Sequence, residues 1–429
     1  MPIQHKWNLH SYLGDNRKGL LSKLELSNDQ TLFLKNLRKQ ARERIREVFS
    51  EAQGVFRDAK ILSPNEHTQT YLRQQIKAKR SFNHVSYEML SALVKLASNL
   101  NDEQRRAFLN IYPKFRTQGS FQYKTLNVPY CRPPQEMDID DGVYFPMQMF
   151  ENTPALAHRL MIVLVDTALQ SLAAENKGWI FDDSKPTCAR IHVAAQNVHL
   201  DVPMYAIPED KYILIKESMD TRWGMEALAA NNRLDPNSVH LARRDREKWQ
   251  KSDPEVVQQW FIESVNEVGE HLRLACRFLK GWRDVTWKDG GGPSSIALMK
   301  CAVDTLGQSS LDSKDLGLVV KAVASNLANQ LNAGVESPDP SDERPLFPDS
   351  SEHNDHQRSI VEAAIKFDLS LHAAMTTQTK EDAFRFLSQN FGERGIDISL
   401  LVSGLAAPVY MTPAEKSKPT KIEKTMTSG

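Results

Sequence analysis

The chain has 429 residues, 41% of them hydrophobic and 25% charged, and Lys plus Arg balance Asp plus Glu at 54 each. We therefore expect two packed units rather than one core, and the zero net charge argues against long DNA or RNA as a partner. The four cysteines form no CxxC pair, the first residues do not form a signal peptide, and the most apolar run, 160–165, is too short to span a bilayer, so we expect a cytoplasmic protein that binds no membrane.

Residues 27–59 predict a long helix that begins with a Ser-x-x-Gln capping box at 27–30. On a second face of this helix, Arg38, Arg42 and Arg46 recur every fourth residue. Spacing alone favours a solvated face over an edge that meets an anion. Apolar residues recur at steps of three and four, namely Leu34, Leu37, Ala41, Ile45, Val48 and Ala52.

The next part of the chain mixes helices with strands. Residues 84–111 and 154–175 predict helices. Alternating apolar and polar residues predict two strands, 190–193 and 198–202, joined by a turn at 196–197. This pattern indicates a sheet in the first part of the molecule.

The second part of the chain predicts helices. Residues 252–255, Ser-Asp-Pro-Glu, suit the start of a long helix whose apolar side continues to Leu279. Residues 411–429 have little apolar surface and predict a flexible tail. Further helices are expected near 294–307, 313–332, 356–375 and 380–391.

A short acidic cluster, residues 138–142, lies in an apolar, β-prone frame. On a strand, Asp138 and Asp140 would share one face, about 6–7 Å apart, and Asp141 would face the other way. Two carboxylates on one face repel each other unless a cation lies between them. A pair of Mg²⁺ ions would relieve this repulsion and bridge a triphosphate, with Asp201 on another predicted strand as a third ligand.

A glycine turn at Gly119-Ser120 supports a phosphate site next to these acids. Glycine lets backbone N–H groups approach phosphate oxygens, and Ser120 adds a hydroxyl donor. The alternative is that residues 138–142 form a surface turn, since short acidic patterns are common by chance. The combination of Gly-Ser, Asp-x-Asp about twenty residues later and a distant Asp is more specific than any one of its parts.

This order of motifs is the pattern of the DNA-polymerase-β-like nucleotidyltransferases, and the chain resembles the bacterial cGAS/DncV-like nucleotidyltransferases (CD-NTases) of the DncV type. The resemblance implies an α+β fold, with a polymerase-β-like core of mixed sheet and helices. We expect this core, with an N-terminal helical region, over 1–245, an OAS-like helical domain over 246–410 and the tail over 411–429. The segments that carry the resemblance are TQGSFQY (117–123), QEMDIDDG (135–142), HLDVPMYAIP (199–208), SDP (252–254), CRFLKGWRD (276–284), GGPSS (291–295) and GVESPDPSDERPLFP (334–348).

The family implies a cyclic dinucleotide synthase that makes 3′,3′-cyclic GMP-AMP from ATP and GTP and releases diphosphate. Two Mg²⁺ ions, or Mn²⁺ in their place, would serve as cofactors. The product would be a second messenger in anti-phage (CBASS) defence and would activate an effector. The alternatives are a synthase of another cyclic di- or oligonucleotide, a nucleotidyltransferase that modifies an RNA end or a small molecule, and a nucleotide-binding scaffold without catalysis.

The resemblance also assigns roles to single residues. A ubiquitin-activating-like partner is expected to join Gly429 to another molecule. Lys280 and Arg190 have a second explanation as surface cations, and Ser295 as a helix cap. By resemblance, the metal ligands are Asp138, Asp140 and Asp201, the donor contacts are Gln118, Gly119, Ser120 and Tyr123, the adenine-nucleotide contacts are Arg190 and Ser252, and the guanine-nucleotide contacts are Lys280, Ser295 and Asp342.

Overall fold

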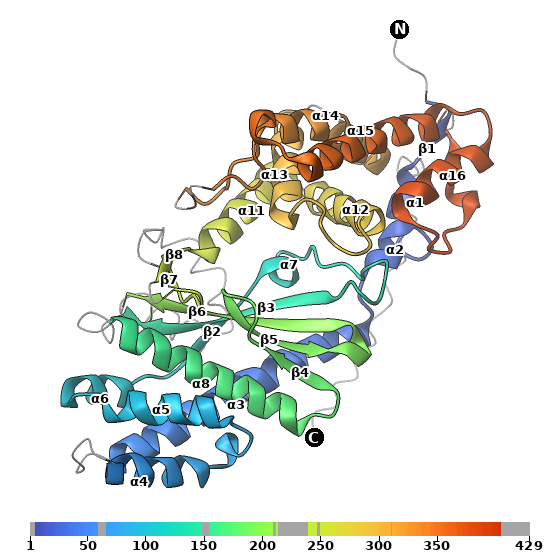
Figure 1. The fold of residues 1–429 in the computed structure, drawn as a ribbon. Helices are drawn as coiled ribbons and strands as arrows, with labels where there is room; N and C mark the ends of the chain where they lie inside the picture. Colours follow the sequence, from blue (N-terminus) through green and yellow to red (C-terminus); the bar gives the residue numbers. More distant parts are fainter. Residues whose placement is uncertain are drawn as a thin grey trace, which may run out of the picture.

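The computed structural model has the α+β architecture expected from the sequence, a mixed sheet with helices followed by a helical unit (Figure 1). Within the part of the chain that it describes, no helix has both the length and the apolar character needed to cross a membrane. The predicted tail at 411–429, including Gly429, lies outside this part. The described residues are 5–58, 66–147, 154–208, 212, 239–246, 249–309, 311–340, 342 and 344–404.

The central sheet has the strand order β2-β3-β6-β5-β4, and two short strands continue from β6. β3 and β6 run parallel, and the other neighbouring strands are antiparallel. The predicted hairpin is confirmed as β5 and β6, and Asn197 adopts a left-handed turn conformation between them with φ 49°. The strands are β2 (Lys114–Gln118), β3 (Met137–Pro146), β4 (Trp179–Asp182), β5 (Cys188–Val193), β6 (Val198–Ile207), β7 (His240–Leu241) and β8 (Gln250–Lys251).

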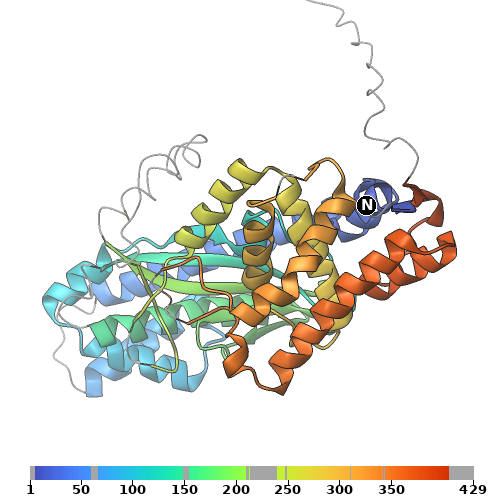
Figure 2. The same ribbon diagram turned by 90° about the horizontal axis from the view of Figure 1, so that it is seen from above.

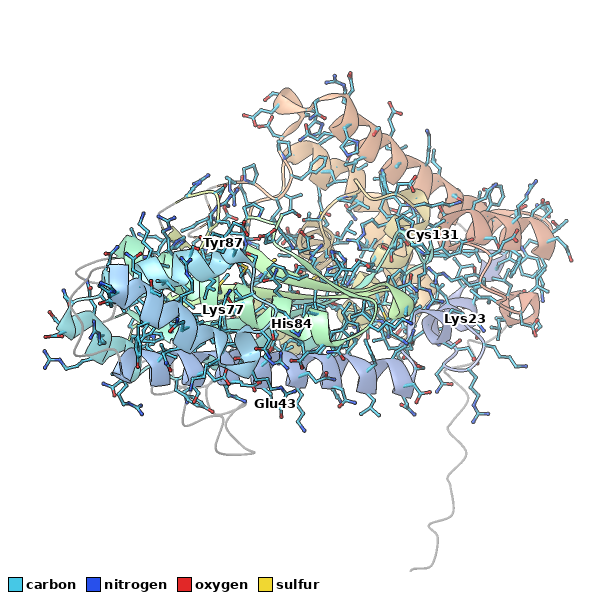
Figure 3. The ribbon with its side chains drawn as sticks, turned by 60° about the horizontal axis from the view of Figure 1, so that its bottom comes forward. Lys23, Glu43, Lys77, His84, Tyr87 and Cys131 are labelled. Carbon is cyan, nitrogen blue, oxygen red and sulfur yellow. The ribbon has the colours of Figure 1, made fainter. Side chains whose placement is uncertain are left out.

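Helices cover one face of this sheet, with α3 (Asn28–Asp58) and α8 (Pro154–Glu175) next to it (Figure 1). The predicted capping box is confirmed, because the backbone N–H of Ser27 donates to Gln30 Oε1 at 2.9 Å and that of Gln30 donates to Ser27 Oγ at 3.1 Å. Figure 3 brings this layer forward and shows Glu43, Lys77 and Tyr87 on it. The layer is completed by α4 (Glu66–Lys77), α5 (Tyr87–Ser98) and α6 (Asp102–Leu109).

Two predicted long helices are wrong as single helices. The helix expected at 84–111 is divided into α5 and α6, because Asn101 makes a complete capping box for the second of them. The helix expected from Ser252 to Leu279 is divided at Gly269, whose φ of +113° is a conformation that ends a helix. The predicted start is confirmed, since Asp253 caps α11 with Pro254 in its first turn.

The helical unit takes elements from both ends of the chain. Strand β1 (Trp7–Asn8) pairs with β9 (Val402–Ser403), and the short helices α1 (His10–Gly14) and α2 (Leu20–Leu24) pack into the same core as the C-terminal helices. Figure 2 shows this unit from above, lying over the sheet. Its main helices are α11 (Pro254–Val268), α12 (His271–Thr286), α13 (Ser295–Leu306), α14 (Leu316–Ala333), α15 (Asp355–Thr376) and α16 (Lys380–Phe391).

The molecule has two main hydrophobic cores, one on each side of the junction between the units. In the first, Phe49 of α3 stacks on Phe145 of β3 with ring centroids 5.3 Å apart. In the second, Trp282 of α12 stacks on Phe367 of α15 at 4.7 Å. Each unit therefore has its own apolar support, and the junction between them is left for polar groups.

The arginine stripe of α3 faces the sheet, so the interpretation as a solvated face is wrong. Arg42 binds the buried Asp141 with two nitrogens, at 2.5 and 2.6 Å. Arg38 donates to Thr117 Oγ1 at 2.6 Å, and the guanidinium of Arg46 lies 4.9 Å from the Phe115 ring centre. These contacts fix α3 to the back of β2 and β3.

We expect Arg42→Ala to destabilise the protein by about 3 kcal/mol, because it leaves the Asp141 carboxylate buried without its partner. The matched control is Lys39→Ala on the same helix, whose 3.9 Å pair with Glu43 is exposed at both ends and should be worth less than about 0.5 kcal/mol. Urea unfolding of both variants measures the difference. Equal, small losses would show that the Arg42–Asp141 pair does not hold the helix to the sheet.

Candidate active site

The strand register brings the three predicted metal ligands together. On the parallel strands β3 and β6, Asp140 lies opposite Asp201 and Asp138 lies opposite His199. These side chains share the sheet face away from α3, whereas Asp141 faces α3, as the alternation predicts. Two acids of β3 and a third from β6, which is distant in sequence, therefore meet on one face.

Asp201 is ion-paired with two cations. Lys185 Nζ lies 2.5 Å from Asp201 Oδ2, and Arg190 binds both carboxylate oxygens, with Nη2 2.7 Å from Oδ2. Burial acts to raise the pKa of Asp201, but the hydrogen bond from Arg190 and the charges of both cations outweigh it and lower the pKa to about 2. Asp201 is thus an anion at neutral pH.

Asp140 is half-buried among like charges. Burial raises its pKa most, and the neighbouring carboxylates of Asp138 and Asp201 add to the effect, so that the pKa reaches about 8. Lys185 and His199 offset only part of this shift. In the absence of a bound cation, Asp140 therefore holds a proton at neutral pH.

His199 and Lys185 belong to the site although the motifs do not point to them. His199 Nε2 lies 3.0 Å from Asp138 Oδ1. Burial lowers the pKa of His199, but its contact with Asp138 more than compensates and raises the pKa above the usual value. His199 was detectable, because it precedes Asp201 by two residues on a strand and so shares its face. Lys185 lies in the segment before β5, where no periodicity marks it.

The Gly-Ser turn lies directly against the acids. The chain leaves β2 at Gln118 and turns at Gly119, with φ +65°, into the short helix α7 (Gly119–Gln122). A Cβ atom on Gly119 would overlap Oδ2 of Asp140, so only glycine fits. The Gln118 side chain is held by Tyr144, to whose hydroxyl it donates at 2.5 Å, and by Tyr205, whose hydroxyl donates to its Oε1 at 3.3 Å.

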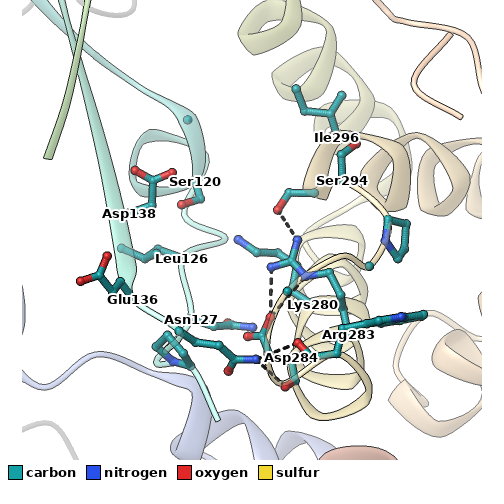
Figure 4. Close-up of a pocket in the computed structure, with 18 of the residues that line it drawn as sticks. Ser120, Leu126, Asn127, Glu136, Asp138, Lys280, Arg283, Asp284, Ser294 and Ile296 are labelled. Atoms are coloured by element: carbon teal, nitrogen blue, oxygen red, sulfur yellow. Dashed lines mark hydrogen bonds and ion pairs between the residues drawn. The ribbon is translucent and has the colours of Figure 1, made fainter. Parts of the chain in front are cut away.

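A cavity of about 730 Å³ lies between the core and the helical unit. Figure 4 shows Ser120, Glu136 and Asp138 on one side of it and Lys280 and Arg283 on the other. One wall therefore supplies the acids, a glycine turn and Lys185, and the opposite wall supplies Lys280 and Arg283 together with Asp284, which Arg283 binds at 3.0 Å. Of the predicted site residues, Gly119, Ser120, Tyr123, Asp138, Asp140, Lys280 and Ser295 line the cavity.

Lys280 is buried rather than a surface cation. Its Nζ donates to the backbone oxygen of Thr125 at 2.8 Å, and burial, followed by the charge of Arg283, lowers its pKa to about 8. Ser295 Oγ accepts from Arg283 at 2.8 Å, and the helix cap is the preceding Ser294, not Ser295. Lys280 and Ser295 both line the cavity, where they can contact a bound anion.

Five predicted site residues lie apart from the lining. Asp201 and Arg190 are paired with each other beneath it, and Gln118 is held by the two tyrosines. The backbone N–H of Ser252 donates to Val239 at 3.1 Å. Asp342 lies in the loop after α14, where Arg344 Nε donates to its Oδ1 at 3.3 Å, and the cavity described here does not include it.

The carboxylates fit the Mg²⁺ ions that the resemblance implies. Mg²⁺ prefers oxygen ligands, and Asp138 and Asp140 open to the cavity with Asp201 on the adjacent strand. The raised pKa of Asp140 reflects a repulsion that a cation would remove. Asp138, Asp140 and Asp201 would hold the ions. When no ion is bound, Lys185 and Arg190 balance the negative charge of Asp201.

Comparison with known proteins identifies relatives over nearly the whole chain. Residues 113–205 match the model "Cyclic GMP-AMP synthase DncV-like, nucleotidyltransferase domain", and residues 269–404 match "Cyclic GMP-AMP synthase, C-terminal domain". A cyclic GMP-AMP synthase of Escherichia coli is 41% identical over 444 residues, covering 99% of this chain and all of that protein. One of Vibrio cholerae is 40% identical, covering 99% of each.

Solved structures of the Vibrio cholerae protein DncV have the same fold. DncV in complex with the linear intermediate pppA(3′,5′)pG gives a TM-score of 0.83 at 41% identity, covering 93% of this chain and 99% of that one. A DncV variant in complex with ATP, GTP and 5MTHFGLU2 gives 0.84 at 40% identity, covering 92% and 99%.

We expect Gly119→Ala to disturb the acidic site. Gly178 is the matched control, since it also has a positive φ, +83°, but open space around it. Both alanines should bear about 1–2 kcal/mol of left-handed strain, and Gly119→Ala should lose roughly a further 1–3 kcal/mol from overlap with Asp140. Unfolding measurements with and without Mg²⁺ test this prediction. Equal losses of unfolding free energy in the two variants would show that a Cβ atom at residue 119 does not disturb Asp140.

We expect the free energy of unfolding of the metal-free protein to fall between pH 5 and pH 8 relative to that of Asp140→Asn. The pKa of Asp140 is raised to about 8 in the folded state against about 4 when unfolded, so the folded form binds the extra proton in this window and loses stability as that proton leaves. Saturating Mg²⁺ should reverse the trend. Parallel pH profiles of the two metal-free proteins would contradict the assignment.

Proposed function

The chain belongs to the DncV-like cyclic GMP-AMP synthase family of nucleotidyltransferases, and we propose that it joins ATP and GTP into 3′,3′-cyclic GMP-AMP. The observation that carries the proposal is the meeting of Asp138, Asp140 and Asp201 beside the Gly119-Ser120 turn, at a cavity whose other wall is cationic. Related proteins support the substrates, because DncV has been solved with ATP and GTP and with the linear intermediate pppA(3′,5′)pG.

The chain's own residues would orient the donor triphosphate. Ser120 and the backbone N–H groups of the Gly119 turn face the cavity next to Asp140, where they can donate to phosphate oxygens. Lys280 and Arg283 face them from α12 and can neutralise phosphate charge. Bound Mg²⁺ would supply activation of the ribose hydroxyl and stabilisation of the leaving diphosphate.

The paired state of Asp201 gives Lys185 and Arg190 a proposed role. They keep the third carboxylate ionised and its oxygens oriented before a metal binds. An oriented anion needs less reorganisation than a free side chain when the site is filled. Arg190 would then act on the metal ligand, and its predicted contact with the adenine nucleotide, like that of Ser252, stays a prediction.

The most detailed part of the proposal is which nucleotide base each part of the site selects. A carboxylate accepts both the ring N–H and the exocyclic amine of guanine, a pair of donors that adenine lacks, which is the reason to expect Asp342 in guanine recognition. The alternative product remains another cyclic di- or oligonucleotide. The zero net charge of the chain gives no support to RNA as an acceptor.

The biological setting rests on the family resemblance. A product used as a second messenger in anti-phage defence, an effector that binds it and a conjugating partner at Gly429 are expectations of that kind. Gly429 lies outside the described residues, so its modification stays a prediction.

The test is product analysis of the purified chain with all four NTPs and Mg²⁺. Mass spectrometry should find cyclic GMP-AMP, and the double variant Asp138→Ala, Asp140→Ala should lose about a thousandfold or more in rate, because the metals that stabilise developing charge lose their ligands. The control pair is Asp29→Ala, Asp102→Ala, two exposed aspartates on helices behind the sheet. Near-normal product from the first pair, or none from the unaltered chain, would refute the proposal.

A further inference from the structure

A second group of possible metal ligands lies next to the acids. Glu136 directly precedes β3, His192 is on β5, and His199 is on β6 opposite His192. The metal-ligand atoms of these three side chains all lie within 4.8 Å of one another. They come from three separate segments, so the sheet register and not a local sequence motif brings them together.

The donor spacing suits a four-coordinate ion. Glu136 Oε2 lies 3.0 Å from His192 Nδ1 and 3.1 Å from His199 Nδ1. With metal–ligand bonds near 2.05 Å, the ligand atoms of a tetrahedral Zn²⁺ site are about 3.3 Å apart. Small side-chain movements would therefore seat an ion among these three atoms. The side chains are 13–26% exposed, which leaves access for a water molecule as the fourth ligand.

Each histidine also has a carboxylate behind it. His192 Nε2 lies 3.3 Å from Asp182 Oδ2, and His199 Nε2 lies 3.0 Å from Asp138 Oδ1. Histidines that ligate metals commonly give their other N–H to a carboxylate, which orients the ring and makes the free nitrogen a better ligand. His192 makes this contact with Asp182, whereas the Nε2 of His199 lies close to Asp138 without hydrogen-bond alignment. Both rings leave Nδ1 directed at Glu136.

We propose that Glu136, His192 and His199 bind a transition-metal dication of the Zn²⁺ class, next to the three aspartates and in contact with Asp138 through His199. Imidazole nitrogens favour Zn²⁺, Co²⁺ or Ni²⁺, whereas Mg²⁺ prefers oxygen ligands only. This assignment concerns binding and does not depend on the proposed catalytic function.

The test is titration of the full chain with Co²⁺ in millimolar Mg²⁺, which fills sites made of oxygen ligands alone. One equivalent should bind with the intense visible absorption of four-coordinate Co²⁺, and Zn²⁺ should displace it. We expect His192→Ala to weaken binding by at least about 100-fold. Asp182→Asn changes the carboxylate behind His192 but keeps an oxygen that can accept from the Ser184 N–H, and should weaken binding by roughly 10-fold. The matched control is His84→Ala, an exposed histidine on the layer of helices behind the sheet (Figure 3).

Folding is monitored for each variant by metal-free unfolding, and His192→Gln, which keeps a polar side chain, should show the same loss as His192→Ala. Absence of the four-coordinate spectrum in the unaltered chain would overturn the proposal. So would wild-type affinity in both His192 variants. In either case the cluster is a hydrogen-bonded network only.

Discussion

The repulsion between Asp140 and Asp201 is the constraint around which the core is arranged. The two carboxylates lie opposite each other on parallel strands, with Asp201 fully buried and Asp140 half-buried at the cavity. The two carboxylates are stabilised differently. Lys185 and Arg190 both bind Asp201, whereas the pKa of Asp140 is raised. Asp201 is therefore an anion without a bound metal, whereas the negative charge of Asp140 requires a cation nearby.

Strand alternation lets the same short cluster serve both faces of the sheet. Asp138 and Asp140 face the cavity, and Asp141 faces back to Arg42 of α3. The contact between Arg42 and Asp141 is a buried ion pair with two hydrogen bonds. It fixes β3 to α3 at the residue next to Asp140, which faces the cavity. A shift of one residue in register would exchange these faces and lose both interactions.

The sequence was most informative where the pattern is local. The capping box at 27–30, the hairpin of β5 and β6 and the opposite direction of Asp141 all follow from spacing within a few residues. The arginine stripe shows the limit, since spacing places Arg42 on a face but Asp141, its partner, is 99 residues away. The pairing of Lys185 with Asp201 could not be predicted from spacing either, because it depends on how the segment before β5 lies against β6.

The cavity needs walls of opposite charge, and two separate cores provide them. The acids belong to the sheet, and Lys280 belongs to α12 of the helical unit, whose position is set by its own apolar packing around Trp282. Arg283 of the same wall is already paired with Asp284 of its own helix at 3.0 Å, whereas, among the described residues, the nitrogen of Lys280 donates only to a backbone oxygen, that of Thr125. Metal ions require the acids, and phosphate requires the cations. Holding the two groups on independent cores keeps both available, and a metal-bound triphosphate is the kind of ligand that satisfies both walls at once.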